Sequence, residues 1–146
     1  MPHTQLTLRE YRALADVRYH LRRFLHASEE FAREAGIESQ QYLLLLAIKG
    51  MPEGQPATVG EIAERLLVKQ HSAAELIDRT EARGFVRRER GEHDRRQVFV
   101  RLTRTGDDLL RRLAARHRAE LRAIGPELAA ALTGALATRD EVRIER

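Results

Sequence analysis

The chain has 146 residues, of which 42% are hydrophobic and 5% aromatic, and this composition suits one compact domain with an aliphatic core. It contains no cysteine, which excludes disulfides, thiol-based redox sensing and cysteine-ligated metal sites. The first twelve residues contain no apolar signal core, and no apolar run approaches the roughly 20 residues of a membrane span. We therefore expect a cytoplasmic protein without a membrane segment.

The formal net charge of +4 is concentrated in one quarter of the chain. Between Lys69 and Arg104 there are ten basic and six acidic residues, a surplus of four, so the other 16 basic and 16 acidic residues cancel. A surplus of this kind is typical of a surface that faces phosphate. Charge alone fits a solvated, arginine-rich hairpin equally well.

The N-terminal part predicts two helices. Residues 6–35 carry apolar side chains at spacings of three and four, which indicates one long helix with an apolar stripe. Residues 37–49 predict a second helix that is apolar nearly all round and therefore central. The glycines and prolines of residues 50–56 predict a loop.

Two short helices joined by a turn follow. Thr58 and Glu61 have the spacing of a capping box, which predicts a helix start there and a helix that ends near Leu66. A second helix is expected over residues 70–83, and Gly84 is placed to end it.

The remaining segments predict a hairpin and more helix. Residues 85–89 and 98–102 read as two extended runs around a polar loop, which is a hairpin with a charged tip. A long helix is expected to start at Thr103 or Thr105 and to be broken at Gly125-Pro126, with a last helix over residues 127–137.

This order predicts a mainly α fold with a small β-hairpin wing. A winged helix-turn-helix lobe over residues 37–104 is flanked by long helices over residues 1–36 and 105–146. The apolar stripes of these outer helices need a partner, and the economical solution is a homodimer in which the terminal helices of two chains intertwine.

Four short motifs resemble the MarR family of transcriptional regulators. They are Val59-Gly60-Glu61-Ile62-Ala63-Glu64-Arg65-Leu66, Ser72-Ala73-Ala74-Glu75-Leu76-Ile77-Asp78-Arg79, Gly84-Phe85-Val86-Arg87-Arg88, and Asp94-Arg95-Arg96 followed by Leu102-Thr103-x-x-Gly106. Their order and spacing carry the resemblance, which extends over nearly the whole chain and implies a single domain of this family. Three positions depart from the family's pattern: Leu67 replaces a common glycine in the turn, Lys69 a small capping residue and Thr80 an apolar residue.

The second short helix is the candidate recognition helix, whose first residues would reach base edges in the major groove of double-stranded DNA. Gln70 suits adenine and His71 suits guanine. Ser72 suits a base or a phosphate, while Ala73 and Ala74 permit close approach. Lys69 and Arg79 are candidate phosphate contacts. The alternative is that Gln70 and Ser72 only cap the helix.

The resemblance also implies that a wing arginine enters the minor groove. Arg96 matches that role best and Arg95 second, with Asp94 expected to orient Arg96 through a charge-assisted hydrogen bond. Arg90 completes the candidate DNA contacts. The alternative is a solvated hairpin tip.

Many family members are released from DNA by small aromatic or phenolic ligands, and four residues are candidates to line such a site: His20, Arg23, His26 and Tyr42. The alternative is that they are ordinary surface or interface residues. The dispersed histidines do not predict a metal site, and no cofactor motif is present.

Other classes of function find less support. The chain has no phosphate-binding glycine loop, no nucleophile elbow and no metal-binding His-Glu pair, so an enzyme is not expected. The resemblance implies a sequence-specific DNA-binding regulator, a repressor that binds a palindromic operator as a homodimer and is released by a small-molecule ligand. The main alternative is a winged-helix protein-interaction module without specific DNA binding. Such a module would be expected to lose its wing arginines and recognition-helix polarity, and this chain has both.

Overall fold

The structure, a computed structural model, describes residues 5–137. Residues 1–4 and 138–146 of the predicted terminal segments lie outside the described range. The chain forms two compact units. One, called the lobe here, is Phe31–Arg116. The other, called the two-helix unit, consists of the residues up to Glu30 and from His117 onward.

Two long helices contribute to both units. Helix α1 is Leu8–Glu34, and it starts two residues later than predicted because Thr7 caps it. The Thr7 hydroxyl accepts the Glu10 N–H at 3.2 Å, while the Glu10 carboxylate accepts the Thr7 N–H at 2.6 Å. Helix α5 is Arg104–Ala137.

The predicted break in α5 at Gly125-Pro126 is wrong, because Pro126 lies inside one continuous helix. The ring of a proline normally clashes with the Cβ of the preceding residue. Gly125 has no Cβ, so this clash is absent. Ile124, two residues before the proline, is buried, so the helix packs against other residues at this point.

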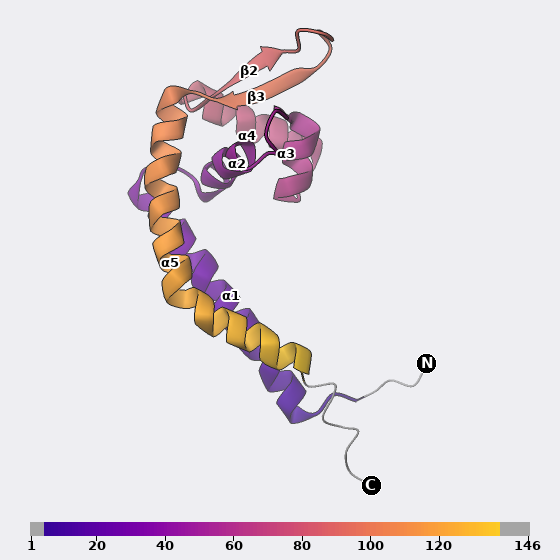
Figure 1. Ribbon diagram of the computed structural model, residues 1–146, viewed down its shortest axis with the longest axis vertical. Helices are drawn as coiled ribbons and strands as arrows, with labels where there is room; N and C mark the ends of the chain where they lie inside the picture. Colours follow the sequence, from indigo (N-terminus) through magenta and orange to yellow (C-terminus); the bar gives the residue numbers. More distant parts are fainter. Residues whose placement is uncertain (1–4, 138–146) are drawn as a thin grey trace. The chain divides into compact units, whose positions relative to one another are not determined.

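The lobe contains three helices and a small sheet (Figure 1). The helices are α2 (Ser39–Lys49), α3 (Val59–Leu66) and α4 (Gln70–Ala82). The strands are β1 (Ala57–Thr58), β2 (Val86–Arg90) and β3 (Val98–Leu102), in the antiparallel order β1-β3-β2. The two-residue strand β1 was not predicted, because a strand this short leaves no alternation in the sequence.

The core of the lobe is aliphatic, as the composition predicted. Its fully buried large side chains include Leu44 and Leu45 of α2, Ile62 of α3, Ile77 of α4 and Val100 of β3. The predicted central position of α2 is therefore confirmed. Thr58 caps α3 as predicted, since its hydroxyl accepts the Glu61 N–H at 3.2 Å.

The base of the wing is joined to the start of α5 by a close backbone contact. The Thr103 hydroxyl donates to the Gly84 carbonyl at 2.5 Å and accepts the Gly106 N–H at 3.0 Å. A Cβ on Gly106 would lie 1.9 Å from the Phe85 carbonyl oxygen. A side chain at the glycine of the Leu102-Thr103-x-x-Gly106 motif would overlap the backbone, so this position requires glycine. The junction fixes where the wing joins α5.

Within the described range, every helix is too short or too polar to cross a membrane.

Candidate nucleic-acid interface

The turn between α3 and α4 presents the start of α4 to solvent. Leu67 adopts the left-handed conformation at φ 56°, and the Val68 N–H donates to the Ala63 carbonyl at 3.0 Å. The chain then enters α4 with Lys69 in the capping position, where its side chain makes no capping hydrogen bond. The first N–H groups of α4 thus remain without a side-chain cap, and together with the helix dipole they favour an anion.

The predicted base-reading residues differ in exposure. Gln70 and His71 are exposed, while Ser72 and Ala74 are half-buried. Ala73 is 0% exposed and belongs to the core, so the expectation that it approaches a base is wrong. Lys69 is the capping residue, so the alternative that Gln70 or Ser72 caps the helix is also wrong.

Gly91 and Asp94 shape the tip of the wing. The Gly91 N–H donates to the Gln97 carbonyl at 2.9 Å, and a Cβ on Gly91 would lie 2.6 Å from the Asp94 carbonyl oxygen. Asp94 Oδ1 accepts the backbone N–H of Arg96 at 3.0 Å and lies 3.5 Å from Arg96 Nε. Asp94 thus orders the backbone of Arg96, while the contact with the guanidinium is an ion pair longer than a hydrogen bond.

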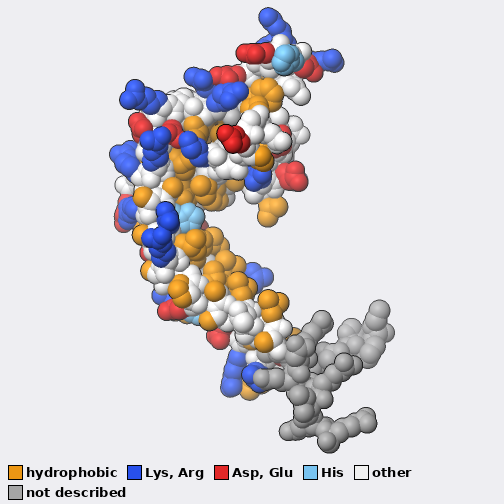
Figure 2. All heavy atoms as spheres, viewed as in Figure 1, with side chains coloured by type: hydrophobic (Ala, Val, Ile, Leu, Met, Phe, Trp, Pro, Cys, Tyr) orange, Lys and Arg blue, Asp and Glu red, His pale blue; other side chains and the backbone are white. Residues whose placement is uncertain are grey.

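The Arg96 side chain is 94% exposed and projects from the wing tip. Arg90 and Arg95 are exposed as well. Figure 2 shows Lys and Arg side chains at the tip of the wing and over the adjoining sheet. These arginines can reach a polyanion without being pulled out of a packed site.

Ion pairs neutralise much of the basic stretch within the lobe. Arg79 pairs with Glu38 at 3.2 Å, and Arg87 and Arg101 both pair with Glu89. Arg88 pairs with two acids of α4. Among the described residues of this stretch, no ion pair engages Lys69, Arg90 or Arg95, nor Arg83 at the end of α4 and Arg104 at the start of α5. The unpaired cations thus include one at the start of α4 and two in the wing.

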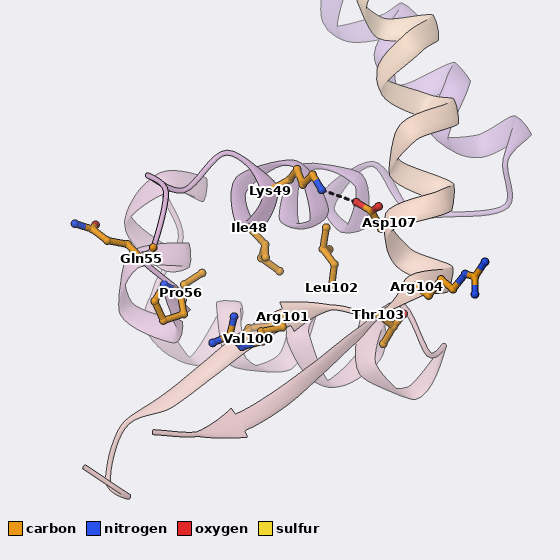
Figure 3. A pocket seen from close by; sticks show the side chains of 12 residues that line it. Ile48, Lys49, Gln55, Pro56, Val100, Arg101, Leu102, Thr103, Arg104 and Asp107 are labelled. Atoms are coloured by element: carbon orange, nitrogen blue, oxygen red, sulfur yellow. Dashed lines mark hydrogen bonds and ion pairs between the residues drawn. The ribbon is translucent and has the colours of Figure 1, made fainter. Parts of the chain in front are cut away.

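The lobe also holds a cavity of about 620 Å³ between the end of α2, the loop before β1, strand β3 and the start of α5 (Figure 3). Ile48, Val100 and Leu102 supply apolar lining, and Lys49 donates to Asp107 at 2.9 Å. This hydrogen bond lowers the pKa of the Asp107 carboxyl. None of the four predicted ligand-binding residues lines this cavity.

Those four residues fall into different units. His20 Nδ1 and Arg23 lie 3.5 and 2.8 Å from one oxygen of Glu127, within the two-helix unit. His26 is exposed in the same unit. Tyr42 is 3% exposed in the core of the lobe, where burial raises the pKa of its phenol. The structure thus brings His20 and Arg23 together.

Arg88 belongs to the Gly84-Phe85-Val86-Arg87-Arg88 motif, but the sequence assigned it no contact of its own. In the lobe it contacts Ala74, Asp78 and Glu81 of α4. The sequence held one sign of these contacts. The spacing of residues 74, 78 and 81 places them on one face of a helix, and the strand that follows is basic.

Comparisons with known proteins agree with this architecture. Residues 35–97 match the MarR family. A protein of Bacillus subtilis (strain 168), described as the uncharacterized HTH-type transcriptional regulator YfiV, is 40% identical over 55 residues. The aligned part is 38% of this chain and 34% of YfiV, so the match spans about a third of that relative.

Solved structures extend the similarity to nearly the whole chain. AbsC, a MarR family transcriptional regulator from Streptomyces coelicolor, is 27% identical with a TM-score of 0.75, over 94% of this chain and 95% of AbsC. A point mutant of S. aureus MepR, bound to an oligodeoxyribonucleotide, is 17% identical with a TM-score of 0.65, over 93% and 100%. This second likeness shows the fold alone. The chain therefore matches the MarR family over residues 35–97, and over nearly its whole length it is similar to a MarR family transcriptional regulator with the same winged helix-turn-helix fold.

Proposed function

We propose that this protein is a homodimeric repressor that binds a palindromic DNA operator and is released from it by a small-molecule ligand. The observation that carries DNA binding is the placement of unneutralised cations beside the exposed start of α4 and at the wing tip. A neighbour of the same fold, MepR, has been solved with an oligodeoxyribonucleotide. Phosphate attraction and base reading are then combined on one face.

In this proposal the start of α4 lies in the major groove. Gln70 and His71 read base edges, and the half-buried Ser72 and Ala74 make shorter contacts with a base or a phosphate. Lys69 binds phosphate beside them. Arg79 contributes more weakly, because its charge is already paired with Glu38.

The wing tip lies in the adjoining minor groove. Arg96 inserts, since its side chain is exposed while its backbone is ordered by Asp94. Arg90 and Arg95 bind the flanking phosphates. Two such lobes in a dimer would meet half-sites about one turn of DNA apart.

The homodimer is supported by the surface of the two-helix unit. Among the described residues, nine of the eleven exposed large hydrophobic side chains belong to this unit: Leu6, Leu8, Tyr11, Leu14, Tyr19, Leu25, Leu121, Leu132 and Leu136. A monomer rarely leaves so much apolar surface in water. A second copy of the chain would bury it.

The ligand is proposed to be a small aromatic or phenolic compound. CouR from Rhodococcus jostii RHA1, 22% identical with a TM-score of 0.60 over 67% of both chains, has been solved bound to p-coumaroyl-CoA. His20, Arg23, His26 and Tyr42 all stay predicted ligand contacts, and of these His20 and Arg23 lie together at one carboxylate oxygen of Glu127.

The test is selection of duplexes from a random library, followed by titration of the selected duplex at several salt concentrations. Gln70→Ala should select a motif relaxed at one position of each half-site. Arg96→Ala should weaken binding and reduce the salt slope by about one unit with little change in motif. Arg112→Ala, which removes the same charge from α5, is the matched control. Recovery of no motif by the wild-type protein would favour the protein-interaction module instead.

A further inference from the structure

We propose that Arg88 is a positioning residue that fixes the wing to the recognition helix and so sets the spacing between the two DNA-reading elements. This inference rests on the proposed DNA binding. It also removes Arg88 from the cations that bind phosphate. The argument uses α4 and β2, which both belong to the lobe.

Arg88 contacts α4 at three successive turns. Its guanidinium lies 2.7 Å from Asp78 Oδ1 and donates to Glu81 Oε1 at 3.0 Å and to the Ala74 carbonyl at 3.3 Å. Residues 74, 78 and 81 share one face of the helix because they are spaced by four and three. A planar guanidinium with five donors can hold several such acceptors at once, whereas an ammonium is a single point charge.

A fourth contact involves the backbone of the wing. Strand β2 is at the edge of the sheet, and the Arg88 N–H donates to Glu81 Oε2 at 2.8 Å. The carboxylate of Glu81 therefore binds both the side chain and the backbone of one residue of the wing. It fixes the edge strand itself, which a contact between two mobile side chains would not do.

Arg88 is also less exposed than its basic neighbours. Its side chain is 28% exposed, against 59% for Arg87. Two nearby carboxylates offset its charge. A guanidinium held in this way is a poor contact for a further anion, whereas its removal would leave the wing free to turn about its base.

Affinity measurements separate positioning from phosphate binding by their sign. Glu81→Ala removes a negative charge from α4, so electrostatics alone predicts tighter binding to DNA. Loss of the clamp predicts weaker binding, by roughly tenfold for a contact of this kind. Glu75→Ala is the matched control, because it removes the same charge from an exposed position on the same helix. Arg88→Lys keeps the charge and loses the planar fork.

A second measurement reads the position of the wing without DNA. The chain has no cysteine, so the double substitution Glu92→Cys with Glu64→Cys places two spin labels, one on the wing and one on α3. Double electron–electron resonance spectroscopy on labelled chains, diluted into unlabelled protein, then gives the distribution of distances between the two labels within one chain. Thermal melts show whether each variant is folded.

We expect Glu81→Ala and Arg88→Lys to weaken binding to the duplex selected by the wild-type protein, to leave the salt slope unchanged, and to broaden the distance distribution. The proposal is overturned if Glu81→Ala tightens binding as Glu75→Ala does, or if the distribution stays as narrow as in the wild type. If the wild-type protein selects no duplex, DNA binding itself fails. The distance measurement still decides whether Arg88 holds the wing.

Discussion

Leu67 provides the turn between α3 and α4 at the cost of backbone strain. In the described part of the chain, Leu67 is the only residue other than glycine that has a positive φ, 56°. Its side chain is 91% exposed. A left-handed conformation costs a residue with a Cβ roughly 1–2 kcal/mol. Very little burial offsets this cost.

We therefore expect Leu67→Gly to raise the free energy of unfolding by about 0.5–1 kcal/mol, because the relieved strain exceeds the extra chain entropy of glycine. Urea unfolding measures the difference. Leu67→Ala is the control, since it shortens the side chain but keeps the Cβ. An equal gain in both variants would contradict strain as the cause and would point to the exposed leucine side chain.

Thr80 shows how a polar residue occupies a core position. It is 0% exposed, and its hydroxyl donates to the Leu76 carbonyl at 2.7 Å, one turn earlier in α4. The buried hydroxyl therefore has a partner within its own helix. Threonine at a position that is usually apolar therefore moves the end of α4 very little. The helix runs to Ala82, one residue short of the prediction.

At the scale of elements, the junction of the wing with α5 depends on one close approach. Gly106 is buried in the first turn of α5, where a Cβ would overlap the Phe85 carbonyl oxygen. Backbone atoms on both sides cannot move without displacing the wing or the helix. This junction therefore couples two elements that both belong to the lobe.

Gly106→Ala should lower the free energy of unfolding by about 3 kcal/mol, at the upper end of the range for overpacking, because backbone must shift. The control is Gly134→Ala in the same helix. No atom lies within 4 Å of its added Cβ, so it should be neutral or stabilising by up to about 1 kcal/mol. Both are measured by chemical unfolding. Equal effects would show that helix propensity, not the close approach, governs position 106.

The ion pair between α2 and α5 predicts a dependence on pH. Lys49 lowers the pKa of Asp107 below its ordinary value of 3.8, so the stabilisation is complete above that value and is lost as pH falls through the lower folded value. Asp107→Asn should thus be less stable than the wild type at pH 7. The difference should shrink as the pH is lowered below 4. Lys49→Met should show the same trend, and a difference constant with pH would assign the effect to packing.

The bounds of several elements could be predicted because their signals are local. Thr58 marks the start of α3, Gly84 has φ 78° after α4, and the alternating run over Val98–Leu102 coincides with β3. The strand β1 and the continuity of α5 through Pro126 depend on tertiary contacts, which no short pattern records.

The residues of the candidate site could likewise be predicted from the sequence only where their role follows from position along the chain. The start of a recognition helix is a position along the sequence, so Gln70 and His71 could be named and are exposed. The burial of Ala73 depends on which face of α4 meets the core. The contacts of Arg88 depend on how the hairpin folds back onto α4, and spacing alone does not give this.

At the scale of the whole molecule, the two units bury their apolar residues differently. The lobe encloses an aliphatic core, whereas the two-helix unit leaves Leu14, Leu132 and other large side chains 45% or more exposed. The lobe therefore has the core of an independent domain. The exposed apolar surface of the two-helix unit fits the proposed dimer interface.

A charge introduced into that surface should separate the proposed dimer. Leu132→Glu places a carboxylate at a position that is 45% exposed in a single chain, so it should cost the monomer little. In a dimer the same carboxylate would lose its water without gaining a partner, which costs several kcal/mol. Sedimentation equilibrium should show a shift toward monomer, and affinity for a two-half-site duplex should fall with it, because one lobe alone loses the second half-site. Leu67→Glu, on the 91% exposed turn of the lobe, is the control that should stay dimeric. A Leu132→Glu protein that remains fully dimeric would place the interface on another surface.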